Sequence, residues 1–351
     1  MSLTHLKDFL FREKLLTISI IGFIVSILYT QKFPTYSKSQ LEVIFILSML
    51  FISVNGMQRG RLLEAIAKKI ERGGAIFLKL ILATFFLSIF VTNDIAIIVI
   101  VPITLTINIE RKDILVILEA LSANAGSALS PIGNPQNLFI YWHYNLSILE
   151  FIKVIAPFSI FFLLLLGTIG YFLNPRVDIN VKDIEIDRVS FIYLAILSII
   201  VVSILHIIPI YFSIIAFIFA LLFDKKTLIL DYSLLIIFFL FFGIADNLEN
   251  IFNLKIEHSN HIFILSALIS QIISNVPATL LFAKFTLNWK ALLWGVNVGG
   301  FGTLFGSLAN LIAYRLYTKD VIGKKFRFTL LFHIFNFIAF LIAILLFFLY
   351  F

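Results

Sequence analysis

Residues 124–137 interrupt an apolar part of the chain with a run of small and polar side chains. The run reads Asn-Ala-Gly-Ser-Ala-Leu-Ser-Pro-Ile-Gly-Asn-Pro-Gln-Asn and separates the apolar segments 114–121 and 138–141. Its prolines, Pro131 and Pro135, each remove a backbone N–H donor and clash with the carbonyl four residues earlier. The run therefore predicts a helix that is broken in its middle.

Composition places this break inside a membrane. The chain has 351 residues, of which 61% are hydrophobic and 13% charged, and its mean hydropathy is +1.05. Soluble domains carry about a quarter charged residues, so these values predict an all-α polytopic membrane protein. Unpaired backbone groups in lipid cost several kcal/mol each, so the break must face protein or a watery cavity. Broken membrane helices with Ser and Asn side chains are typical of ion and solute sites near the middle of the bilayer.

An internal repeat predicts a second broken helix. With a shift of 173 positions, five residues recur unchanged: Asn124, Gly126, Gly133, Asn137 and Leu138 meet Asn297, Gly299, Gly306, Asn310 and Leu311. Ser130 meets Thr303, so a hydroxyl recurs at the same place. We therefore expect one broken helix at 114–142 and a second at 291–314.

Thr92, Asn93 and Asp94 separate two apolar runs within residues 75–109 and leave no room for a loop outside the membrane. A single helix across both runs would be far longer than a bilayer needs. A re-entrant hairpin with Asn93 at its tip instead brings the basic residues at both of its ends to one side of the membrane. The charge distribution therefore favours a hairpin at 75–109.

A second hairpin is expected at 261–286. Its tip contains Ser274 and Asn275, and a shift of 182 positions aligns Asn93 with Asn275. Each half of the chain would then contain one hairpin and one broken helix.

The remaining apolar runs complete a topology of nine spans and two hairpins. The expected spans are 15–30, 41–56, 114–142, 150–173, 190–205, 208–223, 231–245, 291–314 and 328–350. A charged cytoplasmic linker at 174–189 divides the first repeat, 1–173, from the second, 190–351, and the extra helix at 190–205 inverts the second repeat. The basic amphipathic segment 58–72 is expected to lie on the membrane surface.

This topology places 20 of the 27 Lys and Arg residues in loops on the inner side. Such a bias predicts a cytoplasmic N-terminus and a multi-pass location in the cell (inner) membrane. The formal charge of +7 is then explained by these loops and does not predict nucleic-acid binding. The first apolar run lacks a small-residue cleavage site, so we expect a retained helix and not a signal peptide.

The two tips and two breaks would bring half-helix ends to one place. Each helix N-terminus offers free N–H donors and about half a positive charge, which suits an anion. Exposed carbonyls and the oxygens of Asn, Ser and Thr suit a sodium ion. The alternative is that the polar residues at the tips, such as Asn93 and Asn275, only cap tight turns.

Two acidic residues are candidates for a proton relay. Asp94 is the acid expected at mid-membrane, where an ionisable group acts as a proton carrier or a cation ligand. Its repeat partner is Val276, so the two tips are not chemically equal. Glu119 lies about two turns inside its helix, and a partnership with Lys79 explains it as well as a proton relay does.

The sequence contains no signature of an enzyme. It has no cysteine, no glycine-rich phosphate loop ending in Gly-Lys-Ser/Thr and no His-Glu-x-x-His motif. We therefore expect neither nucleotide-driven transport within this chain nor a resident cofactor, apart from bound sodium ions.

The tip and break motifs together resemble those of the ion transporter superfamily, which includes citrate transporter-like and dicarboxylate permeases, arsenite efflux proteins and one type of sodium/proton antiporter. The matching motifs are Thr92-Asn93-Asp94-Ile95-Ala96, residues 124–137 and Ser274-Asn275-Val276-Pro277-Ala278. The dicarboxylate branch has Ser-Asn-Thr at both tips, and both threonines are replaced here. The acidic first tip is closer to the arsenite and antiporter branches.

The resemblance implies a scaffold domain and a transport domain, usually in a homodimer, with the solute between two cation sites. It would place sodium at Asn93 with the break 130–134, and at Asn275 with the break 303–306. The predicted binding residues are Thr92, Asn93, Asp94, Asn124, Ser130, Gly133, Asn134, Asn137, Ser274, Asn275, Asn297, Thr303, Gly306 and Asn310.

These features predict a secondary active transporter that moves a small anion or oxyanion, coupled to sodium or protons. The alternatives are sodium/proton antiport, with Asp94 as the exchanging carboxylate, and arsenite-type efflux. A passive channel needs a continuous pore, whereas hairpins that end at mid-membrane favour alternating access.

Because the chain has no cysteine, single introduced cysteines report the topology directly. Lys68→Cys and Lys319→Cys should react only with an impermeant maleimide applied to the cytoplasmic side, and Ser37→Cys only from outside. Labelling of Lys68→Cys and Lys112→Cys from opposite sides would show that the first hairpin is a spanning helix.

Overall fold

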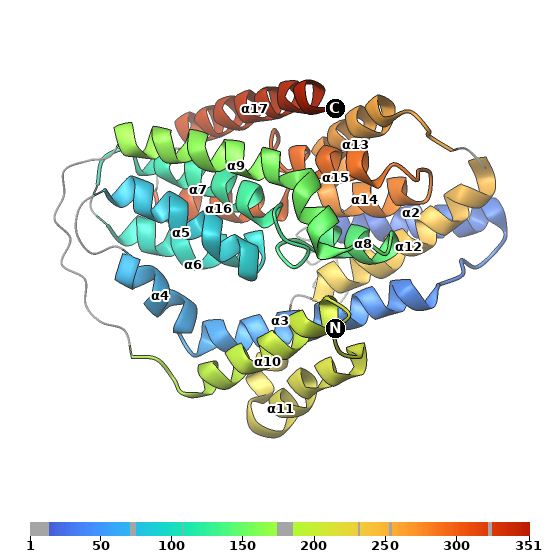
Figure 1. The fold of residues 1–351 in the computed structure, drawn as a ribbon, viewed down its shortest axis with the longest axis horizontal. Helices are drawn as coiled ribbons and strands as arrows, with labels where there is room; N and C mark the ends of the chain where they lie inside the picture. Colours follow the sequence, from blue (N-terminus) through green and yellow to red (C-terminus); the bar gives the residue numbers. More distant parts are fainter. Residues whose placement is uncertain are drawn as a thin grey trace, which may run out of the picture.

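The computed structural model describes residues 14–70, 75–107, 109–173, 185–230, 232–252, 255–321 and 325–351, which form helices joined by turns and short loops (Figure 1). Four segments there are long and apolar enough to cross a membrane: Lys38–Arg59, Ile148–Phe172, Lys225–Glu249 and Lys325–Tyr350. Shorter apolar helices accompany them. The prediction of an all-α polytopic membrane protein is confirmed.

Five framework helices pack on one side of the molecule. They are α2 (Lys14–Thr30), α3 (Lys38–Arg59), α10 (Val189–Ile204), α11 (Ile215–Phe223) and α12 (Tyr232–Phe252). α3 contacts α10, α11 and α12, and α2 packs along α12. The 3-10 turns η1 (Ile210–Ile214) and η2 (Lys225–Leu228) flank α11, and α4 (Leu62–Ile70) leads from α3 toward the centre.

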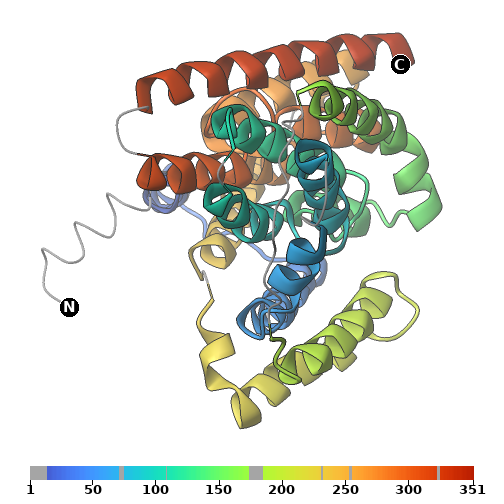
Figure 2. The same ribbon diagram turned by 90° about the vertical axis from the view of Figure 1, so that its left-hand side faces the viewer.

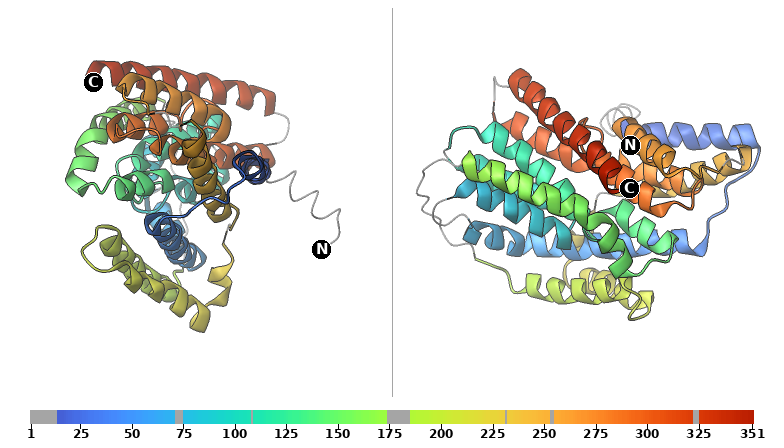
Figure 3. Two further views of the ribbon diagram at one scale, coloured as in Figure 1. Left: turned by 90° about the vertical axis from the view of Figure 1, so that its right-hand side faces the viewer. Right: turned by 45° about the horizontal axis from the view of Figure 1, so that its top comes forward.

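The centre of the molecule consists of two hairpins and two interrupted helices. The hairpins are α5 (Ile76–Phe90) with α6 (Asn93–Thr106), and α13 (Ser259–Ile273) with α14 (Asn275–Ala283). The interrupted helices are α7 (Lys112–Ser127) with α8 (Pro135–His143), and α15 (Trp289–Val298) with α16 (Leu308–Asp320). α9 (Ile148–Phe172) and α17 (Lys325–Tyr350) cover this centre on the face opposite α10 and α11 (Figures 2 and 3).

Both halves of the chain use the same set of contacts. α5 packs on α7 as α13 packs on α15, and α6 packs on α16 as α14 packs on α8. The second helix of each hairpin therefore contacts the interrupted helix of the other half. The inverted orientation of the two repeats across a membrane remains a prediction.

Small residues allow these close contacts. A Cβ on Gly126 would lie 2.3 Å from the carbonyl oxygen of Phe85, and one on Gly295 would lie 2.7 Å from that of Phe263. Glycine therefore lets α7 approach the backbone of α5, and α15 the backbone of α13, as small residues do in membrane helix pairs.

The helix predicted at 41–56 is longer than expected, because α3 continues to Arg59. Gly56 is packed against the ring of Tyr193, where an added Cβ would lie 2.2 Å from Cδ2, so this glycine serves helix packing and not helix termination. The surface helix predicted at 58–72 is correspondingly wrong in its first turn, since α4 begins at Leu62. Residues 71 and 72, the last two of that prediction, lie outside the described part of the chain.

Two later boundaries also differ. The span predicted at 231–245 is longer than expected, because α12 continues to Phe252 and the carboxylates of Asp246 and Glu249 pair with Lys284. α16 continues past 314 to Asp320, because the ring of Tyr317 is buried 3.9 Å from that of Phe328. Most of the predicted linker, 174–184, lies outside the described residues.

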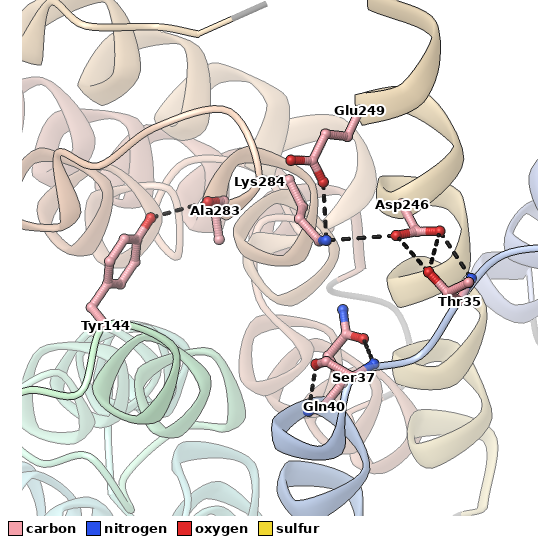
Figure 4. A network of polar contacts seen from close by, with 8 residues as sticks. All are labelled: Thr35, Ser37, Gln40, Tyr144, Asp246, Glu249, Ala283 and Lys284. Atoms are coloured by element: carbon pink, nitrogen blue, oxygen red, sulfur yellow. Dashed lines mark hydrogen bonds and ion pairs between the residues drawn. The ribbon is translucent and has the colours of Figure 1, made fainter. Parts of the chain in front are cut away.

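An ionic link joins the second hairpin to the framework helices (Figure 4). Lys284 follows α14, and its Nζ lies 3.0 Å from Glu249 Oε2 and 3.7 Å from Asp246 Oδ1, both on α12. Asp246 also accepts a hydrogen bond of 2.9 Å from the backbone N–H of Thr35. On the other side of α14, Tyr144 donates to the carbonyl of Thr286 at 2.9 Å. The end of the hairpin is thus anchored from two directions.

Replacing Lys284 should weaken this anchor. The side chain of Asp246 is only 14% exposed, so Lys284→Met leaves a largely buried carboxylate without its cation and should cost about 1–3 kcal/mol of unfolding free energy. The exposed Lys255 supplies a control, since Lys255→Met should change stability by less than about 0.5 kcal/mol. Thermal unfolding in detergent measures both, and equal stability of the two variants would contradict the anchoring role.

Candidate functional site

Each hairpin tip is hydrogen-bonded to the break of its own half. The backbone N–H of Asn93, the first residue of α6, donates to Gly133 O at 3.2 Å. The backbone N–H of Asn275, the first residue of α14, donates to Gly306 O at 3.0 Å. The internal repeat pairs the two donors and the two acceptors, so the halves form the same contact.

Two buried asparagines donate hydrogen bonds to the backbone carbonyl groups that the breaks leave without helical partners. Asn137 Nδ2 donates to the carbonyl oxygens of Ser127 and Ala128, both at 3.2 Å. Asn310 Nδ2 donates to the carbonyl oxygens of Gly300 at 2.9 Å and Thr303 at 3.1 Å. Since neither side chain is exposed, these amides replace the helical partners that the broken segments lack.

The same two asparagines bind across the two halves. Asn124 Nδ2 donates to Asn310 Oδ1 at 2.8 Å, and Asn297 Nδ2 donates to Asn137 Oδ1 at 2.9 Å. Each bond joins the first piece of one interrupted helix to the second piece of the other. These crossed bonds bring the two breaks to one buried cluster.

Asn124 makes four side-chain hydrogen bonds within this cluster. Its Oδ1 accepts hydrogen bonds from Asn93 Nδ2 at 2.8 Å and from Ser307 Oγ at 2.9 Å. Its Nδ2 also donates to the carbonyl of Gly300 at 3.2 Å. The first tip, the second break and the centre of α7 therefore share one side chain.

The remaining predicted residues have more local partners. Ser130 Oγ accepts from the backbone N–H of Ile132 at 3.2 Å, and Thr303 Oγ1 accepts from that of Gly306 at 3.1 Å. Asp94 is half-buried at the start of α6, and its backbone N–H donates to Asn93 Oδ1 at 3.0 Å.

The second tip is built differently from the first. Ser274 has φ +76°, an uncommon conformation for a residue other than glycine, and its Oγ is 3.4 Å from Asn275 Oδ1. Asn93, at the equivalent place in the first half, instead binds Asn124 and Ser307.

Two buried oxygens beside the first tip have no hydrogen-bond partner among the described residues. They are Thr92 Oγ1 and Asn134 Oδ1, in side chains that are 1% and 3% exposed. Thr92 precedes Asn93 and Asn134 follows Gly133, so both flank the bond between the tip and the break. An unsatisfied buried acceptor costs about 1–3 kcal/mol, and hard cations take oxygen ligands of this kind.

Glu119 lies outside this cluster. It is fully buried on α7, about 12 Å along the helix from the break at a rise of 1.5 Å per residue, and accepts a hydrogen bond from Thr104 of α6. This bond holds α6 to α7. A proton relay through Glu119 remains a prediction.

Two residues of the site were absent from the sequence prediction. Ser307 lies in the second break and binds Asn124, and the repeat could have identified it, because a shift of 173 positions pairs it with Asn134. Gln271 lies on α13 one turn before the second tip and binds the second break. Its counterpart at a shift of 182 positions is Ile89, so the repeat gave no signal.

Hairpins and interrupted membrane helices that meet at a buried cluster of Asn and Ser are typical of membrane transporters. The chain belongs to the family described as citrate transporter, whose family model matches residues 9–294. It is therefore a multi-pass membrane transporter. The match covers both hairpins and the first break and ends within α15.

Two known proteins match most of the chain. The uncharacterized transporter MJ0456 of Methanocaldococcus jannaschii is 38% identical over 305 residues, which are 81% of this chain and 83% of that protein. The inner membrane protein YbiR of Escherichia coli is 32% identical over 311 residues, or 81% of this chain and 82% of that protein. A shorter match of 36% over 102 residues, or 28% of this chain and 20% of the relative, is to the silicon efflux transporter LSI3 of rice, Oryza sativa.

The hydrogen bonds predict unequal effects of two repeat-related substitutions. Asn124→Ala removes four hydrogen bonds and leaves Asn310 Oδ1 and Ser307 Oγ short of a partner, so it should cost about 2–4 kcal/mol of unfolding free energy. Asn297→Ala removes two bonds and should cost roughly half as much. Unfolding midpoints of the purified variants give the comparison, and an equal or reversed loss would contradict the central role of Asn124.

Proposed function

We propose that the chain is a secondary active transporter that carries a small anion or oxyanion, coupled to sodium or protons. The observation that carries this proposal is the pair of unpaired buried oxygens, Thr92 Oγ1 and Asn134 Oδ1, where the first hairpin meets the first break. Neutral oxygens in such a place bind a cation instead of a hydrogen-bond donor. A cation held there would move with the solute.

The solute is proposed to be an anion because helix N-termini converge on the cluster. α6 and α14 begin at the tips and α8 and α16 begin after the breaks, and each helix N-terminus carries about half a positive charge. Residues 91–94, 128–134, 274–276 and 299–307 contain no Lys or Arg that could pair with the anion directly.

Helix dipoles alone are too weak for this purpose. Each contributes about 0.3–2 kcal/mol, whereas removing an ion from water costs several kcal/mol. A bound cation would offset the difference. The affinities for solute and cation would then be thermodynamically linked, which is the basis of coupled transport.

Two of the similarities reported above are compatible with this solute class. The family description names citrate, an organic anion, and the name of the rice relative states silicon efflux. The proposal therefore covers organic carboxylates and inorganic oxyanions alike.

Sodium/proton antiport and arsenite-type efflux are the alternatives. They are supported by Asp94, a half-buried carboxylate at the start of α6 beside Asn93, which could exchange a proton for a cation. A passive channel is disfavoured because the asparagines of the cluster are at most 5% exposed, whereas a channel needs polar side chains that line a continuous pore.

We further propose a location in the cell (inner) membrane with a cytoplasmic N-terminus, in contact with lipid. The distribution of Lys and Arg and the name of the Escherichia coli relative support it. A homodimer is proposed from the resemblance to the superfamily. Exposed apolar side chains on α9 and α17, such as Leu164 and Leu341, are suited to lipid or to a second copy.

Charge removal at Asp94 tests the coupling. A thermal-shift screen of carboxylates, sulfate, phosphate and arsenite, with and without sodium, would select the solute. Uptake of that solute into proteoliposomes should saturate and follow an imposed sodium or proton gradient, and Asp94→Asn should abolish the gradient-driven part. Asp320→Asn, at the exposed end of α16, is the matched control and should transport normally.

If Asp94→Asn transports normally at every pH and sodium concentration, Asp94 serves only the structure of the turn and has no role in coupling. Uptake that neither saturates nor follows a gradient would contradict the transporter proposal itself.

A further inference from the structure

The second break is filled by a side chain of its own hairpin. Gln271 reaches from α13 into the break, where its Oε1 accepts from the backbone N–H of Thr303 at 2.8 Å and its Nε2 donates to Gly299 O at 3.0 Å. The backbone carbonyl of Gln271 accepts from Thr303 Oγ1 at 2.8 Å. Gly302, with φ +88°, gives the amide room, because a Cβ there would lie 2.3 Å from Gln271 Oε1.

The first break has no such side chain. The residue equivalent to Gln271 in the first hairpin is Ile89, which carries no polar atom. The two unpaired oxygens of the cluster, Thr92 Oγ1 and Asn134 Oδ1, both lie in this first half.

Both unpaired oxygens have paired counterparts in the second half. The repeat aligns Thr92 with Ser274, whose Oγ donates to Asn275 Oδ1. It aligns Asn134 with Ser307, whose Oγ donates to Asn124 Oδ1 and accepts from the backbone N–H of Ala309 at 3.2 Å. The equivalent positions of the second half are therefore hydrogen-bonded, whereas those of the first half remain open.

From these contacts we infer that the amide of Gln271 takes the place of a cation at the second break, so that the protein binds one sodium ion, at the first break through Thr92 and Asn134. The inference deepens the proposed function and rests on it. An NH₂ group directed at Gly299 O supplies the partial positive charge that a cation would otherwise supply. A cation could enter only by breaking its hydrogen bonds to Gly299 and Ala267.

The choice of sodium over a proton at the first break follows from the ligands. A hydroxyl and an amide oxygen are neutral and do not take up a proton near neutral pH, whereas both are ordinary ligands of hard cations. The residues that hold the ion are thus distinct from Asp94, whose carboxylate can titrate.

Equilibrium binding of radioactive ²²Na⁺ to the purified full chain in detergent, without solute, tests the inference. We expect one sodium ion per protomer. Thr92→Val, which keeps the shape of the side chain and removes the hydroxyl, should weaken binding by about tenfold or more, because one ligand oxygen is lost. Thr106→Val, the same substitution at the exposed end of α6, should leave the affinity unchanged. Unchanged helical content by circular dichroism controls for folding.

Gln271→Glu provides a gain-of-binding test at the second break. The substitution puts a carboxylate oxygen where the NH₂ group now faces Gly299 O, and two oxygens in contact attract a cation between them. This variant should bind a second sodium ion at pH 8. A stoichiometry that stays at one would show that Gln271 does not stand at a cation position, and the inference would fall.

Two sodium ions in the unmodified protein, or equal losses in Thr92→Val and Thr106→Val, would also overturn the inference. So would a complete absence of sodium binding. If sodium does not bind, the proposed function is tested separately by measuring whether a proton gradient drives uptake in proteoliposomes.

Discussion

Two helices of this apolar protein are broken, and the backbone carbonyl groups at the breaks lack helical hydrogen bonds. The fold depends on supplying these carbonyl groups with other donors. Asn137 and Asn310 bind these carbonyl groups, and the crossed bonds from Asn297 and Asn124 hold both asparagines in place. Because each crossed bond joins opposite halves of the chain, neither break is completed without the other half. The packing of α6 on α16 and of α14 on α8 brings these halves together.

The chemistry of the cluster follows from the same constraint. Amide and hydroxyl groups form hydrogen bonds to the backbone groups at the breaks without introducing a charge. A charge would cost free energy to bury. The cluster is therefore neutral apart from the nearby Asp94, and an anion must rely on helix N-termini and on a co-bound cation. The halves share a backbone design but differ in side chains, since Gln271 fills the second break and Thr92 and Asn134 keep open oxygens at the first. Under our proposal, this difference is the reason why a protein with two similar repeats binds a single sodium ion.

Much of this arrangement could be predicted from the sequence, because a repeat of Asn and Gly in an apolar chain has few structural solutions. The breaks, the tips and the repeat-related asparagines were identified in this way. Gln271 was missed because it has no repeat partner, and the extension of α12 to Phe252 was missed because it depends on Lys284, distant in sequence. Contacts between residues that are distant in sequence and have no repeat partner can be identified only from the folded structure.

The crossed asparagine bonds are tested most directly by a double-mutant cycle on Asn124 and Asn310. Unfolding free energies are measured in detergent for the unmodified protein, for Asn124→Ala, for Asn310→Ala and for the double variant. The account predicts that the double loss differs from the sum of the single losses by about 1–3 kcal/mol, as for buried side chains in direct contact. Losses that add within about 0.5 kcal/mol would contradict it, because the two halves would then be held together by other contacts.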